Sequence, residues 1–228
     1  MAPSNPTLVG FKTAAGLTVA VDAFTPSARS LLLLFGSARV ATVAVPSPID
    51  IVEAGGIDWE YIGRLTSTNN ASSPSTRTTL WLGYAPSSPV SIAPSIKCPD
   101  SAQVSLAIAQ VATGFGSIRA AFVANNSGDP NPSLSPAPDA SSLIISYTHQ
   151  AGVGVFTTEP LANELLDDHT NQQSNGLRYT NGSGPSIATW GSGNTRSVGV
   201  IVEVLSGSGA PNEAFPVRPF IAPLGGMM

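Results

Sequence analysis

The sequence predicts an all-β protein, an antiparallel two-sheet β-sandwich with a jelly-roll-like arrangement. Short apolar runs recur along the whole chain, and many of them alternate apolar with polar residues as half-buried strands do. Turn-forming clusters separate the runs, and the 20 prolines and 22 glycines follow no period. Only ANELLDDH at 162–169 has spacing that suits a helical turn or two, and it also suits the entry to a strand.

The expected strands are short and spread evenly over the chain. They lie at 7–11, 17–24, 29–35, 39–45, 59–65, 79–85, 103–112, 118–124, 142–148, 152–158, 177–181, 186–190 and 196–205. In the strand that follows Asp100, bulky residues alternate with small ones such as Ala107 and Ala109. Small side chains along one face indicate that a neighbouring surface approaches that face closely.

Residues 30–45, SLLLLFGSARVATVAV, carry the most apolar run of the chain. The run is too short for a membrane span, which needs about 20 apolar residues, and Gly36 and Arg39 interrupt it. A continuous apolar run of this length is typical of a strand buried on both faces. We therefore interpret 30–45 as a pair of central strands.

The chain also contains a loose internal repeat. Residues 30–45 align without a gap with 142–157, SLIISYTHQAGVGVFT, and 88–111 resembles 184–205. These quasi-repeats, at about 29–111 and 141–205, predict one sandwich domain over 7–205 that is built from a duplicated set of strands. A chance resemblance between two β-rich sequences is the alternative.

The two ends differ from this pattern. Residues 1–6 form a short expected N-terminal arm, and residues 206–228 contain four prolines, which exclude a central strand. We interpret 206–228 as an extended C-terminal arm. The residues expected to bind a partner are the apolar anchors of this arm and one leucine of the 125–140 loop: Phe215, Val217, Phe220, Ile221 and Leu134.

The composition argues against several classes of function. Charged residues make up 11% of the chain and the net charge is −4, so the clustered lysines and arginines of a nucleic-acid-binding protein are missing. The first residues, MAPSNPTLVG, do not resemble a signal peptide, and we expect no membrane association. The single cysteine, Cys98, excludes an intramolecular disulfide and a cysteine-based zinc site, and we expect it to be a small buried side chain.

The sequence contains no catalytic motif that we recognise, and we assign no catalytic residue, metal ligand or cofactor. Asp167, Asp168 and His169 lack further metal ligands at a useful spacing. Two tryptophans, Trp59 and Trp190, are candidates for stacking on sugar rings, with packing in the sandwich as the alternative.

A family resemblance rests on four segments: WEYIGRL, RTTLWLGY, QVSLAIAQV and the closing IATWGSGNTRSVGVIVEVL. With the apolar strands before them, these segments make residues 28–205 resemble a class of small β-sandwich proteins, jelly-roll or lectin-like, from the structural gene clusters of tailed bacteriophages. The resemblance is one of spacing, not of a diagnostic motif.

The resemblance implies a non-enzymatic virion protein made in the cytoplasm of a bacterial host. We expect a capsid decoration (cement) protein on the outer capsid surface, bound to the major capsid protein and to copies of itself, with a trimer as the first expectation. The alternative is a tail- or fibre-associated protein, or a free lectin-like module that binds carbohydrate.

Overall fold

The computed structural model describes residues 1–41, 45–68, 75–125, 130–152, 163–170, 173–181 and 196–207. The strands are β1 (Thr7–Ala15), β2 (Thr18–Ala20), β3 (Leu31–Val40), β4 (Asp50–Glu53), β5 (Glu60–Ser67), β6 (Ser75–Tyr84), β7 (Ser95–Lys97), β8 (Gln103–Val111), β9 (Phe115–Asn125), β10 (Leu143–Gln150), β11 (Asn163–Asp168), β12 (Ser174–Asn181) and β13 (Ser197–Ser206). The described residues form no helix, so the all-β prediction is confirmed.

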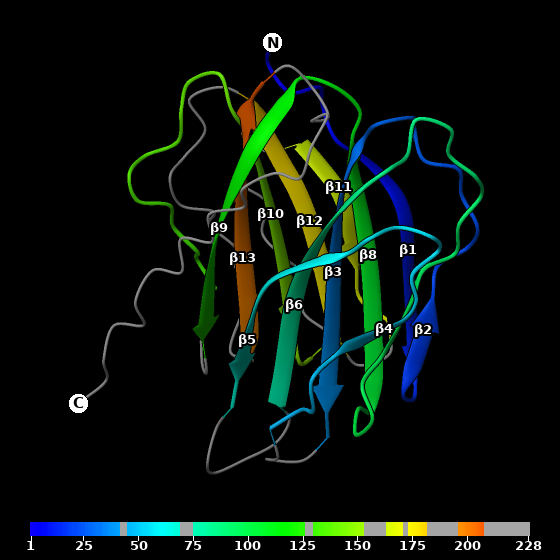
Figure 1. The fold of residues 1–228 in the computed structure, drawn as a ribbon. Helices are drawn as coiled ribbons and strands as arrows, with labels where there is room; N and C mark the ends of the chain where they lie inside the picture. Colours follow the sequence, from blue (N-terminus) through cyan, green and yellow to red (C-terminus); the bar gives the residue numbers. More distant parts are fainter. Residues whose placement is uncertain are drawn as a thin grey trace.

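Two five-stranded antiparallel sheets pack face to face as a sandwich (Figure 1). The N-terminal sheet has the order β1-β8-β3-β6-β5, and the C-terminal sheet has the order β11-β12-β10-β13-β9. A three-stranded cover sheet, β2-β7-β4, packs on the outer face of the N-terminal sheet. Each large sheet uses strands from one half of the chain, whereas both sheets of a jelly roll draw strands from both halves. The two-sheet sandwich is therefore confirmed, but jelly-roll connectivity is not.

The two large sheets repeat each other strand for strand. The central strands are β3 and β10, and each lies between the last two strands, in chain order, of its own sheet. The edge strands β5 and β11 also shift register against their neighbours at matching places, between Tyr61 and Gly63 and between Glu164 and Leu166. This agreement supports the internal duplication and extends it to β1 and β9, which occupy equivalent edges.

The central strands begin in the same way. The hydroxyl of Ser30 donates to the Ser27 carbonyl at 2.8 Å, and the hydroxyl of Ser142 donates to the Asp139 carbonyl at 2.7 Å. Later in these strands, the rings of Phe35 and Tyr147 stack with a centroid separation of 4.9 Å. The alignment suggested by the sequence thus matches positions that meet across the sandwich.

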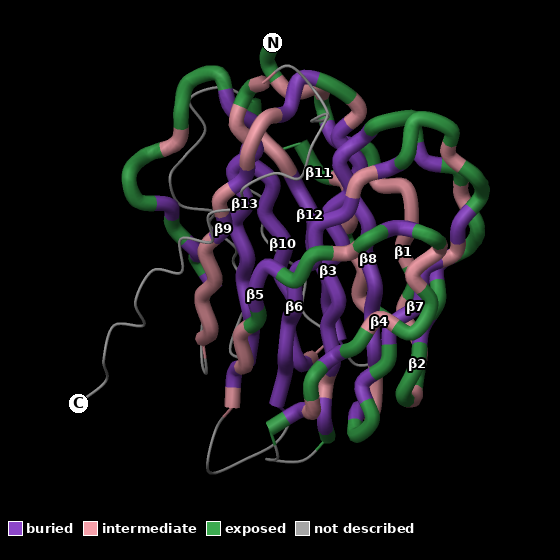
Figure 2. The backbone as a smooth tube through the Cα atoms, in the orientation of Figure 1, coloured by how far each residue is buried: buried purple, intermediate pink, exposed green. Residues whose placement is uncertain are grey.

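Strand β3 is buried on both faces, as the sequence predicts (Figure 2). Leu31 and Leu33 pack between the two large sheets, whereas Leu32 and Leu34 pack under the cover sheet. The expected division into strands 29–35 and 39–45 is wrong, because β3 runs without a break from Leu31 to Val40. Gly36 lies inside the strand, where a Cβ atom would come within 2.9 Å of Ile96 and Trp81.

Other strand predictions need correction. Residues 163–168 form β11 and not a helical turn, because they pair with β12 while Leu165 and Leu166 pack against the central core. Strands β4 and β7 were not among the expected strands, and β2 is shorter than the expected 17–24. The expected strand 186–190, and 152–158 apart from Gly152, lie outside the described residues.

The four outer strands of the two large sheets are irregular. Each of β1, β5, β9 and β11 pairs with its neighbour through a register shift. The pairings of the central strands β3 and β10 contain no such shift. Bulges at edges twist the strand and interrupt the row of free backbone groups, which hinders the addition of a strand from another molecule. A partner is therefore more easily accommodated by the faces or ends of the sandwich than by its edges.

Residues 1–6 bind to the protein's own fold. The backbone N–H of Ser4 donates to the Thr113 carbonyl at 2.9 Å, and the Ser4 hydroxyl accepts from the Ala112 N–H at 3.0 Å. The N–H of Gly207 donates to the Met1 carbonyl at 3.2 Å, so the C-terminal segment starts beside the N-terminus. The expected N-terminal arm at 1–6 is thus anchored on the protein's own fold. Residues 208–228, with Phe215, Val217, Phe220 and Ile221, lie outside the described residues.

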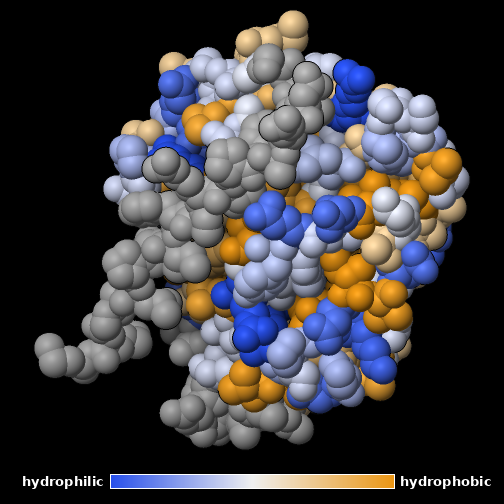
Figure 3. All heavy atoms as spheres, viewed as in Figure 1, coloured by the Kyte–Doolittle hydropathy of each residue, from blue (hydrophilic) through white to orange (hydrophobic). Residues whose placement is uncertain are grey.

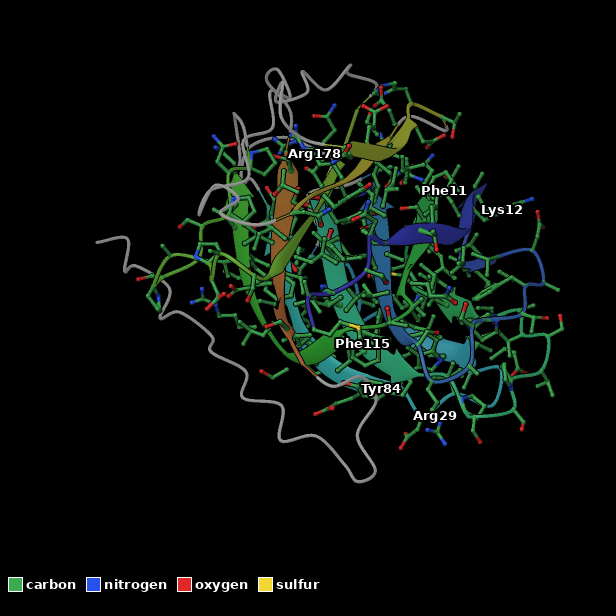
Figure 4. The ribbon with its side chains drawn as sticks, turned by 90° about the horizontal axis from the view of Figure 1, so that it is seen from above. Phe11, Lys12, Arg29, Tyr84, Phe115 and Arg178 are labelled. Carbon is green, nitrogen blue, oxygen red and sulfur yellow. The ribbon has the colours of Figure 1, made fainter. Side chains whose placement is uncertain are left out.

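The end of the sandwich near the N-terminus is closed by aromatic side chains. Tyr84 and Phe115 lie together when the molecule is seen from above (Figure 4), with ring centroids 6.1 Å apart. Phe115 is the first residue of β9 and is fully buried, so it seals the apolar end of the layer between the sheets.

Candidate functional site

The layer between the large sheets changes from apolar to polar along the central strands. Towards the ends of β3 and β10 it contains side chains that we call the buried polar cluster. Its members are Ser37, Thr78, Ser105, Tyr147, His149 and Asn175, and each of them is 0% exposed. A buried polar group is costly unless it is hydrogen-bonded, so this concentration needs a structural or functional reason.

The cluster joins the two halves of the chain. The Tyr147 hydroxyl lies 3.0 Å from the Ser37 hydroxyl and donates to Oδ1 of Asn175 at 2.9 Å. The Ser105 hydroxyl donates to the same Asn175 oxygen at 2.8 Å. Ser37 and Ser105 belong to the N-terminal sheet, whereas Tyr147 and Asn175 belong to the C-terminal sheet. These bonds therefore fix the position of one sheet over the other.

The duplication places two equivalent polar pairs in this cluster. Ser37 lies two residues after Phe35, and His149 lies two residues after Tyr147, in equivalent strands. Ser37 bonds to its neighbour on β6, Thr78, at 3.0 Å, and Nδ1 of His149 lies 2.9 Å from Oδ1 of Asn175 on β12. The same two strand positions thus hold a hydroxyl pair in one half and an imidazole–amide pair in the other.

The hydrogen bonds define the protonation state of His149. Nδ2 of Asn175 donates to Asp168 at 3.3 Å, which leaves Oδ1 to face His149 as an acceptor. Nδ1 of His149 therefore carries the proton, and Nε2 is a buried acceptor without a partner among the described residues. Burial lowers the pKa of His149 to about 4, and the Arg39 charge adds to this effect although the Asn175 bond opposes it.

Tyr147 is also uncharged at neutral pH. Burial raises the pKa of Tyr147 to about 12, and the Asp168 charge acts in the same direction while the hydroxyls of Ser37 and Ser105 oppose it. A neutral, fully buried set of hydrogen-bonded groups has no access for a substrate. The arrangement suits the alignment of the two sheets better than it suits catalysis.

A second constellation lies where β11 connects to β12. Nδ1 of His169 is 2.9 Å from the Ser174 hydroxyl, and Nε2 of His169 is 2.8 Å from a carboxylate oxygen of Asp167. These contacts resemble a serine–histidine–aspartate triad. Ser174 is 0% exposed, however, and its hydroxyl donates to the Gly152 carbonyl at 2.9 Å. A nucleophile needs an accessible oxygen whose proton can pass to the base. We therefore interpret these contacts as structural hydrogen bonds that hold the connection between β11 and β12.

Two of these three residues, Asp167 and His169, belong to the weak metal-binding pattern in the sequence. No sequence pattern indicated a role for Ser174. No group of three or more His, Cys, Asp and Glu side chains in the described parts of the chain could hold a metal ion. Asp168 instead accepts hydrogen bonds from Thr170 at 2.9 Å and from Asn175.

The aromatic residues considered for stacking on sugar rings differ in how far they are exposed. Trp59 is half-buried, its indole N–H donates to the Ala54 carbonyl at 2.9 Å, and its ring occupies the space beside Gly83. Trp190 lies outside the described residues. Tyr61, which pairs with Trp81 of the N-terminal sheet, is 53% exposed.

Leu134 is a core residue and not an available partner contact. Its side chain is 6% exposed and packs with Ile144 and Ile201 on the outer face of the C-terminal sheet. The loop is anchored beside it, because the buried carboxylate of Glu203 accepts the N–H of Asp139 at 2.7 Å. The burial of Leu134 argues against the expected partner contact at this residue.

Cys98 is fully buried, as expected. Burial is the largest cause that raises the pKa of its thiol to about 11, and a hydrogen bond to Asp100 adds to it. A thiol with this pKa is a poor nucleophile at neutral pH.

Comparisons with known proteins identify no relative. A scan against protein-family models finds no match, and searches of curated proteins and of solved structures find none either. Among the described residues there is also no helix of the length and apolar character needed to span a membrane.

Proposed function

We propose that this chain is a non-enzymatic structural protein of a tailed-bacteriophage virion, and that it decorates the outer surface of the capsid. The sequence resemblance over 28–205 is the origin of this proposal. One structural observation supports it: the polar side chains that converge in the buried polar cluster are fully buried and bonded to one another. They stabilise the sandwich itself, which is the use expected in a scaffold.

The surface suggests how such a scaffold meets a partner. The irregular edges of the large sheets disfavour strand addition. Apolar and polar side chains are interspersed on the face seen in Figure 3. The large aliphatic side chains that are exposed in the described chain, besides Met1, are Leu17, Val45, Val52 and Val90. Single exposed apolar residues are normal, so they do not define a docking surface.

The ends of the chain are the better candidates for partner contacts. Gly207 binds to Met1, so whatever follows Gly207 starts at the end of the sandwich that also carries the N-terminus. We propose that residues 208–228 contact the major capsid protein through Phe215, Val217, Phe220 and Ile221. Apolar side chains in a proline-rich sequence of this kind would contribute affinity by being buried against the partner.

The first test is the copy number of this chain in purified particles, measured by quantitative mass spectrometry against the major capsid protein. Hundreds of copies per particle support decoration of the shell. A few dozen copies or fewer place the chain in the tail or fibres and contradict the capsid proposal. Absence from particles rejects the virion proposal altogether.

The second test separates binding from folding. A variant that ends at Gly207 keeps the bonds of Gly207 to Met1 and to Gly114. We expect it to melt like the full chain but to lose binding to particles that lack the native protein. A matched full-length variant, in which only Phe215 and Phe220 are replaced by serine, tests these apolar anchors without shortening the chain. Saturation of the particles by the truncated variant would reject the role of the segment.

Carbohydrate binding is a second candidate, favoured by one observation. Tyr61 is 53% exposed, and the half-buried Trp59 lies two residues before it. Exposed aromatic rings of this kind can stack on sugars. Host polysaccharide should then quench tryptophan fluorescence, and Tyr61→Ala should abolish the binding. An unchanged signal across a panel of glycans would reject this candidate.

A further inference from the structure

His149 is the buried titratable group of the central layer for which the proposed function gives no role. Its imidazole is 0% exposed, and Nε2 has no partner among the described residues. Such an atom is the place where the next proton from solvent would bind. The resulting N–H would have no acceptor, and an unpaired buried charge is strongly unfavourable.

The groups around His149 do not compensate a positive charge well. Arg39 of β3 is close enough to disfavour the charged form. Asp168 of β11 is the nearest carboxylate in the hydrogen-bond network, but it contacts His149 only through the amide of Asn175 and also accepts from Thr170.

The remaining groups near His149 carry no negative charge at neutral pH. Neighbouring strands contribute uncharged side chains, and Arg196, just before β13, bonds through its backbone carbonyl to the N–H of Ala151. The uncharged groups are Ser37, Thr78, Ser105, Tyr147, Asn175 and Val198. No carboxylate of the described chain therefore lies in direct hydrogen-bond contact with His149.

The bonds that a charged His149 would disturb are those that join the halves. The Asn175 oxygen accepts from His149, from Ser105 and from Tyr147, so a displaced Asn175 loses its contacts with both sheets. The opposite end of the layer is held by apolar side chains such as Leu31, Leu143 and Phe115, which do not titrate.

We propose that the buried polar cluster is an acid-sensitive latch between the two halves of the sandwich. Proton uptake at Nε2 of His149 releases the cross-sheet bonds of Asn175 and Tyr147. The sandwich then loosens at the end where β3 and β10 finish and stays packed at the end that carries the N-terminus. This inference does not depend on a virion role.

Hydrogen exchange measured by mass spectrometry at pH 7.5 and pH 4.5 tests the proposal, after correction for the chemical exchange rate. We expect acid to increase the opening of peptides from β10 and β12 in the wild type. If the pKa of the imidazole is about 4 in the folded protein and 6.5 when the site opens, the opening equilibrium should increase roughly 70-fold between pH 7.5 and pH 4.5. His149→Gln keeps a donor for Asn175 without titrating, and it should remove most of this increase.

The second histidine provides the matched control. His169→Gln should keep the full acid response, because His169 lies outside the cluster and bonds to Ser174. Equal acid responses in the wild type and in His149→Gln would overturn the proposal, as would loss of protection that begins at Leu31 and Leu143.

A second measurement covers the case in which His149→Gln does not fold. The chain has 2 histidines, so two imidazole Cε1–H signals can be followed by NMR in the wild type. We expect one of them to stay in the neutral form until β10 and β12 lose protection. If both titrate near their ordinary midpoint while the protein stays folded, the latch does not exist.

Discussion

Removal of one oxygen atom tests how strongly the buried polar cluster joins the two halves. Tyr147→Phe keeps the ring that stacks on Phe35 and deletes a hydroxyl that bonds to Ser37 and to Asn175. A hydrogen bond between uncharged groups contributes about 1 kcal/mol net. Ser37 keeps Thr78, and Asn175 keeps two other donors, so the deletion leaves no buried partner unsatisfied. We therefore expect a loss of about 2 kcal/mol in the free energy of unfolding.

Urea unfolding at pH 7 measures this loss as a shift of the midpoint at constant slope. Tyr61→Phe is the matched control, because Tyr61 is 53% exposed and its hydroxyl is available to water, so we expect a change within about 0.5 kcal/mol. A double-mutant cycle of Tyr147→Phe with Ser37→Ala should give a coupling energy of about 1 kcal/mol. A Tyr147→Phe effect no larger than that of the control, or a cycle without coupling, would refute the reasoning.

Three further predictions follow from burial and backbone geometry. Leu33→Ala and Leu34→Ala should each lower the free energy of unfolding in urea by about 2–5 kcal/mol, because the two side chains are fully buried on opposite faces of β3. A near-neutral Leu34→Ala would contradict the packing under the cover sheet. Gly114→Ala should expose residues 1–6 to rapid hydrogen exchange, because Gly114 has φ +77 and a Cβ atom there would clash with the Ala2 carbonyl. Unchanged protection of the Ser4 amide would contradict this prediction. Cys98 should react with a thiol reagent at pH 8 far more slowly in the native protein than in urea, because its thiol is buried and its pKa is raised to about 11. Equal reaction rates in the two states would contradict the buried position of Cys98.

Local patterns in the sequence predicted most of the framework. Alternation along β8 correctly separated its two faces, since Ala107 and Ala109 pack between the large sheets while Leu106 packs under the cover sheet. The repeat was also visible, because the two central strands share the spacing from a serine to an aromatic residue. These features depend on neighbours in sequence, so a single chain is enough to show them.

Other features depend on contacts between distant parts of the chain. The short strands β4 and β7 are defined by pairing with each other, and an isolated run of three or four residues carries little signal. The hydrogen bond from Ser105 to Asn175 joins residues 70 positions apart. The sequence likewise showed no sign that Ser4 of the N-terminal arm binds the turn at Thr113.

The differences between the two halves are as informative as their likeness. If the equivalent positions held identical side chains, like groups would face each other across the sandwich. The chain instead places Tyr147 against Phe35, so that one hydroxyl, not two, enters the layer and meets both Ser37 and Asn175. At the next inward position of each strand, β10 has His149 where β3 has the small Ser37. Because the inward-facing side chains of the two halves are complementary and not identical, they favour one arrangement of the sheets. The same difference leaves a single titratable imidazole in the buried polar cluster between the halves.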